Sequence, residues 1–169
     1  MRTLLALIGL IAILVAAAAG VFFFGGFFSV AATDQDPDIV NWALIKVRGA
    51  SIDRHSKDLV APAPAATDPQ AGARLYDTRG CINCHGAPGV EWGKWSEGLN
   101  PDPPDLKDLV PNRTPRELFW VVKHGIKMTG MPSFGAAGMS DEELWKVVAF
   151  LQKLPAITPE EYKAWTAQP

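Results

Sequence analysis

The sequence predicts an all-α protein made of a membrane-spanning helix, a helical arm and a helical domain. An uncharged run from Leu4 to Phe28 is long enough to cross a bilayer as a helix. Several later segments begin with helix N-cap signals and continue with apolar residues at helical spacing. No convincing strand pattern surrounds the only two cysteines of the chain. With Lys+Arg 16 against Asp+Glu 18, the charge balance gives no indication of nucleic-acid binding.

Residues 1–32 are expected to form a retained transmembrane anchor. The apolar run exceeds the roughly 7–15 residues of a secretory signal core and reaches the roughly 20 that a span needs. The alternative is a signal cleaved at Ala17-Ala18-Ala19, which would leave a phenylalanine-rich segment exposed at the new N-terminus. Because Arg2 is the only charge on the short side, the positive-inside rule puts the N-terminus in the cytoplasm and the rest on the oxidising side.

Residues 33–60 are expected to form an amphipathic juxtamembrane arm. Its apolar residues recur at i, i+3, i+4 and i+7, at Val40, Ala43, Leu44 and Val47. Gly49 is the expected stop, and His55 would then lie in a solvated loop. Three placements are open for this arm: docked on a partner subunit, which we favour, at the membrane surface, or packed back onto the domain.

The domain is expected at residues 67–169, after an Ala/Pro linker at 61–66. Pro-rich segments are extended, so the linker would let the domain swing between docking sites. Helix starts are indicated at Asp68-Pro69, where Asp is the N-cap and Pro the first helical residue. Capping boxes mark two further helix starts, Thr114 to Glu117 and Ser140 to Glu143. A short tail helix is expected from Thr158 through Trp165.

Both cysteines lie in the pentapeptide Cys81-Ile82-Asn83-Cys84-His85, which has the C-x-x-C-H pattern of c-type haem attachment. Each thiol can add to one haem vinyl group, and the adjacent imidazole can bind the iron. A structural zinc site would need about four ligands and finds only His55 or His124 as its fourth, neither at the right spacing. A thioredoxin-like pair would need a βαβ pattern, and a plain disulfide would leave His85 unexplained.

The segments Gly72-Ala-Arg-Leu-Tyr76 and Cys81 to Gly86 resemble the start of a class I monohaem cytochrome c. The resemblance covers roughly residues 67–155 and implies three main helices around one covalently bound haem c. It implies thioether bonds at Cys81 and Cys84 and an axial ligand at His85. It also implies a first helix that crosses the last one at Gly72, with Phe150 against the crossing.

The resemblance carries two further residues of the haem site. The segment Pro103-Pro104-Asp105-Leu106 matches the place where the family supplies a proline carbonyl to the proximal histidine, so Pro104 is the candidate acceptor. The segment Thr129-Gly130-Met131-Pro132 matches the distal loop, so Met131 is expected as the second axial ligand, with Met128 as the alternative. His124 is expected at the surface or beside a haem propionate. Trp92 and Trp95 either line the haem or bond to a propionate through their N–H groups, or pack under the loop.

A haem closed by histidine and methionine suits one-electron transfer rather than bond chemistry. The expected protein is therefore not itself an enzyme but a single-pass cytochrome of the bacterial inner membrane with a periplasmic haem domain. Its partners would be a dehydrogenase or quinol-oxidising complex as donor and a terminal oxidase or reductase as acceptor, either in passing contact or within a stable membrane complex. The alternative is a haem c enzyme subunit or gas sensor with a displaceable sixth ligand.

Overall fold

The computed structural model of the chain describes residues 1–63 and 67–167. It contains two compact units, Met1–Gln35 and Asp36–Pro169. Within the described residues every regular element is helical, and the only strand-like pairing is one bridge between Ala87 and Val90. The all-α prediction is confirmed.

The first unit consists mainly of α1, Arg2–Phe24. Of the described helices, α1 alone is long and apolar enough to cross a membrane. It ends at Gly25, so the helix is shorter than the apolar run, which continues beyond it. None of its residues is buried in the structure, and the helix fits a single-pass membrane anchor.

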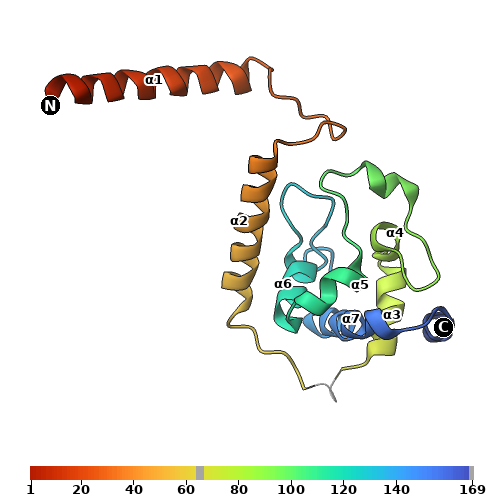
Figure 1. Ribbon diagram of the computed structural model, residues 1–169. Helices are drawn as coiled ribbons and strands as arrows, with labels where there is room; N and C mark the ends of the chain where they lie inside the picture. Colours follow the sequence, from red (N-terminus) through yellow and green to blue (C-terminus); the bar gives the residue numbers. More distant parts are fainter. Residues whose placement is uncertain (64–66, 168–169) are drawn as a thin grey trace. The chain divides into compact units, whose positions relative to one another are not determined.

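The core of the second unit is a helix crossing between α3, Pro69–Thr78, and α7, Asp141–Lys153 (Figure 1). Gly72 is buried at the crossing, where a Cβ would overlap the carbonyl of Lys146. One turn on, the Tyr76 ring lies 5.1 Å from that of Phe150, and both side chains are fully buried. The predicted crossing is confirmed, and glycine is required there because the two backbones touch.

The third helix of the domain is α6, Pro115–His124, which begins with the predicted capping box at Thr114 and Glu117. Ser140 and Glu143 form the same box at the start of α7, and Thr158 and Glu161 form it at the start of α8, Pro159–Thr166. The remaining elements are one-turn helices, α4 (Ile82–His85), α5 (Leu106–Leu109) and the 3₁₀ turns Lys94–Gly98, Val110–Asn112 and Leu154–Ala156.

The tail helix α8 packs against α3. The Tyr162 hydroxyl lies 3.4 Å from Asp77 Oδ1, and Arg74 donates a hydrogen bond to the carbonyl of Trp165. Pro159, at the start of α8, touches the loop after the cysteine motif, because a Cβ on Gly89 would come within 2.8 Å of it. The tail therefore braces both the first domain helix and that loop.

The arm helix α2, Asp38–Ser56, differs from the prediction in its length and in the face that it buries. It runs through Gly49, and His55 lies in its last turn instead of in a loop, so both expectations were wrong. The predicted face with Val40, Leu44 and Val47 is exposed. Ile52 and Ser56 are buried instead, and their end of α2 packs on α6 (Figure 1).

The contact between α2 and α6 is made by named side chains. The His55 ring stacks on Trp120 with centroids 5.7 Å apart, and Arg116 donates a hydrogen bond to the Lys57 carbonyl. The C-terminal half of the arm is therefore part of the domain surface. From the sequence, we favoured docking on a partner subunit over this placement. The proposed linker at 61–66 lies partly outside the described residues, as do the last two residues of the chain.

Candidate haem-binding site

The two thiols lie on one tight turn that follows α3. The amide of Cys81 bonds to the Tyr76 carbonyl, and the amides of Cys84 and His85 both bond to the Cys81 carbonyl. Gly86 ends the turn with φ of 62°, a conformation that favours glycine. The four-residue helix α4 and its N-cap Cys81 therefore present Cys81, Cys84 and His85 on one turn, with both thiols free.

Burial raises the pKa of the Cys81 thiol to about 12 and raises that of Cys84 in the same direction. Both shifts favour the neutral thiol. Within the described residues no group of three or more His, Cys, Asp or Glu side chains could hold a metal ion. The donor set fits thioether attachment of a haem and does not fit a structural zinc site.

The His85 ring is oriented by the chain. Its Nδ1 lies 3.0 Å from the carbonyl oxygen of Pro104, which can only accept, so Nδ1 carries the proton and Nε2 keeps its lone pair. Burial lowers the pKa of His85, although the Pro104 carbonyl and the Asp105 carboxylate act in the opposite direction. A neutral imidazole with a free Nε2 is the form that binds iron.

The three downstream methionines have different surroundings. Met139 is buried in the core and Met128 is 94% exposed, on a loop tip with φ of 59°. Met131 is half-buried and packs against the core that also contacts Cys81 and Ile82. Of the three, Met131 is thus the one that is partly exposed and also packs against the core that the cysteine turn contacts.

A pocket of about 570 Å³ opens beside the His85 ring, between the loop at Ala87 and Val90 and the end of α7 at Leu154. Trp92 and Glu97 line it, and the Trp92 indole N–H donates to Glu97 Oε1 at 3.3 Å. Trp95 is 63% exposed. His124, predicted at the surface, is exposed, and its ring lies against Trp120.

Three features of this region were not predicted. The Tyr76 hydroxyl donates a buried 2.7 Å hydrogen bond to the Gly86 carbonyl, which links α3 to the end of the cysteine turn. The loop with Met131 is packed so closely that a Cβ on Gly125 would touch Met131 and Pro132, and one on Gly130 would touch Leu99. The available signal was the glycine content of 125–135, which identified a loop but not its neighbours.

The comparisons with known proteins agree with this arrangement. A family model described as "Cytochrome C oxidase, cbb3-type, subunit III" matches residues 67–151, which is half of the chain. No curated protein and no solved structure matches the sequence. Cytochrome c domains of this type carry haem c covalently and transfer electrons. The chain therefore belongs to the cbb3-type subunit III family of c-type cytochromes.

Proposed function

We propose that the protein is a membrane-anchored one-electron carrier in which His85 and Met131 are the axial ligands of a single haem c. The observation that carries this proposal is the bond between His85 Nδ1 and Pro104 O, because it fixes the tautomer that leaves Nε2 for the iron. Cys81 and Cys84 would form the two thioether bonds. When bound, haem c supplies an iron that accepts and releases one electron.

The chain holds the ligands of the haem iron in place and excludes other molecules that could bind the iron. The Pro104 carbonyl prevents the His85 ring from rotating and makes Nε2 a stronger ligand. The gas-sensor alternative would need a displaceable sixth ligand and polar groups on the distal side. The assignment of Met131 as a firmly held ligand excludes the first of these.

The topology and partners are also proposals. Residues 1–32 would anchor the chain in the bacterial inner membrane with the N-terminus in the cytoplasm, and the domain from residue 67 would lie in the periplasm, where haem c is attached. The donor would be a dehydrogenase or quinol-oxidising complex. The acceptor would be a terminal oxidase or reductase, and the family's description favours an oxidase complex.

The ligand assignment is tested by replacing two methionines of the same loop. Met131→Ala should leave haem covalently attached, lower the reduction potential and let CO bind the ferrous protein at full occupancy. Met128→Ala should change none of these, because the Met128 side chain points to solvent. Rapid and complete CO binding by the unmodified protein would favour the sensor or enzyme alternative, and a denatured chain without attached haem would refute the whole assignment.

A further inference from the structure

The segment that follows Met131 completes the C-terminal end of α6. The last carbonyls of a helix have no partner within it. In α6 the Val121 carbonyl accepts from Gly125 N at 2.8 Å, the Val122 carbonyl from Phe134 N at 3.2 Å and the Lys123 carbonyl from Gly135 N at 3.0 Å. The loop with Met131 is therefore attached to the helix by main-chain bonds at both of its ends.

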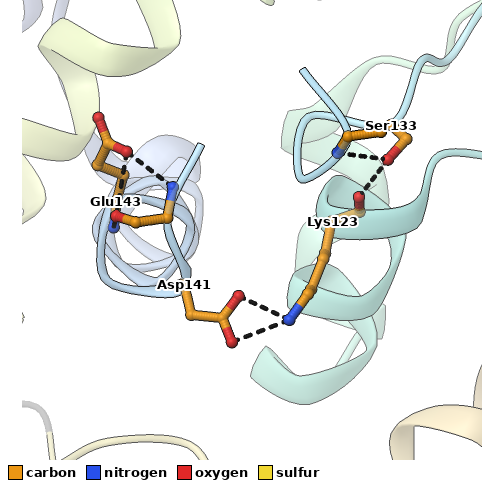
Figure 2. A network of polar contacts seen from close by, with 6 residues as sticks. Lys123, Ser133, Asp141 and Glu143 are labelled. Atoms are coloured by element: carbon orange, nitrogen blue, oxygen red, sulfur yellow. Dashed lines mark hydrogen bonds and ion pairs between the residues drawn. The ribbon is translucent and has the colours of Figure 1, made fainter. Parts of the chain in front are cut away.

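Ser133, two residues after Met131, adds a side-chain contact between this loop and α6. Its Oγ donates to the Lys123 carbonyl at 2.7 Å and accepts from Ala136 N at 3.1 Å (Figure 2). Between Ser133 and Met131 stands Pro132, whose ring fixes its backbone φ. Because this connection is short and contains Pro132, the contact of Ser133 with α6 limits from the C-terminal side where the Met131 backbone lies. From the other side, the Met131 amide bonds to Thr129 Oγ1 and the Met131 carbonyl accepts from Ile126 N.

The Lys123 carbonyl accepts hydrogen bonds from both Gly135 and Ser133, and the Lys123 side chain is also held in place. Its Nζ lies 2.6 Å and 2.9 Å from the two carboxylate oxygens of Asp141 and 5.4 Å from the centre of the Phe119 ring. Asp141 belongs to the first turn of α7, which the Ser140–Glu143 capping box closes (Figure 2). The anchoring point of the loop is thus connected to the central helix of the domain.

The close approach of the loop to α6 also depends on Gly135. A Cβ at this position would lie 3.0 Å from both the carbonyl oxygen and Cγ of Lys123. An added methyl group would therefore push the loop away from the residue to which Ser133 is bonded.

We propose that Ser133 is a positioning residue for the sixth haem ligand, and that its hydroxyl keeps the Met131 thioether at the iron by pinning the loop to the Lys123 carbonyl. The inference rests on the proposed role of Met131 as that ligand. Without the hydroxyl, the loop detaches more often and the sixth position opens more often, although Met131 itself is unchanged.

The test uses the full-length, haem-loaded protein in detergent and measures the rate of cyanide binding to the ferric form and the reduction potential. Ser133→Ala should raise the cyanide-binding rate by about fivefold, the factor that the loss of one typical net hydrogen bond produces in an equilibrium constant. It should also lower the potential. Ser133→Thr keeps a hydroxyl and should restore both values, and Gly135→Ala should act in the same direction as Ser133→Ala.

The matched control is Ser56→Ala, because Ser56 is a buried serine whose hydroxyl also bonds to a main-chain carbonyl, that of Asp53 in α2. It should leave the cyanide rate and the potential unchanged. The inference is overturned if Ser133→Ala and Gly135→Ala lower thermal stability but bind cyanide at the unmodified rate. If instead the unmodified protein binds cyanide as fast as Met131→Ala, the ligand proposal fails, which is a distinguishable result.

Discussion

The crossing of α3 and α7 gives the sharpest stability prediction, because a single methyl group should separate two helices. In Gly72→Ala, the new Cβ would overlap the Lys146 carbonyl and approach Phe150 Cβ to 3.0 Å. The nearest atoms belong to the backbone of α7, so they cannot move aside as the end of a flexible side chain could. The helices must move apart, and overpacking of this kind costs about 1–3 kcal/mol.

The same substitution has a favourable term, since alanine stabilises a helix over glycine by about 0.5–1 kcal/mol. If the overpacking cost lies near the middle of its range and the gain from alanine is subtracted, Gly72→Ala should lower the free energy of unfolding by about 1 kcal/mol net. For a domain of this size, this corresponds to a fall in Tm of about 4–8 °C. The measurement is thermal unfolding of the haem-loaded protein, followed by helical circular dichroism.

Gly49→Ala is the matched control, because Gly49 also lies inside a helix but has open space where its Cβ would be. With no clash, only the helix-propensity term remains, and Tm should stay constant or rise. A neutral or stabilising Gly72→Ala variant would mean that the two backbones do not touch, which would refute the crossing geometry.

Three other predictions follow from single contacts. Tyr76→Phe leaves the buried Gly86 carbonyl without its donor and should cost about 1–3 kcal/mol in denaturant unfolding, whereas Tyr162→Phe, whose hydroxyl contact is 3.4 Å long, should cost less. Burial alone would raise the pKa of Glu117, but hydrogen bonds from Thr114 and the charge of Arg113 outweigh it and leave the pKa lowered. The stabilisation from this capping box is therefore present above pH 4.5 and is lost as the pH falls further, and Glu117→Gln should flatten the acid limb of a stability–pH curve. Trp120→Ala removes the ring on which His55 stacks and should make α2 more sensitive to limited proteolysis, while Trp95→Ala, at an exposed ring, should not.

The helices of the domain could be predicted because their ends are encoded locally. The capping boxes at Thr114 and Ser140 and the Asp68-Pro69 start each satisfy the amides of their own helix, so no distant residue is needed. The attachment motif was equally readable, because the turn that presents Cys81, Cys84 and His85 is only a few residues long. By contrast, Pro104 and Met131 came from the resemblance, since nothing in their spacing indicates what they approach.

The arm shows why periodicity alone fails. The more apolar face of α2, with Val40, Leu44 and Val47, is exposed, and the residues buried where α2 packs on α6 are Ile52 and Ser56. A pattern of apolar residues shows that a helix has a side suited to burial, but it does not identify the surface that covers it. Small residues allow close packing, and the partner Trp120, about 65 residues later, supplies the apolar area.

The docked arm also changes what the Ala/Pro linker can do. An extended linker was expected to let the domain swing, but α2 and α6 are joined by the His55–Trp120 stack, the Arg116–Lys57 bond and the burial of Ile52. The domain can separate from the arm only after these contacts break. Because the other end of α6 holds the Met131 loop through Val122 and Lys123, the helix that binds the arm is also the one that positions the proposed ligand. A variant that releases α2, such as Trp120→Ala, should therefore be examined for its reduction potential as well as for its proteolysis, and an unchanged potential would show that the two ends of α6 are independent.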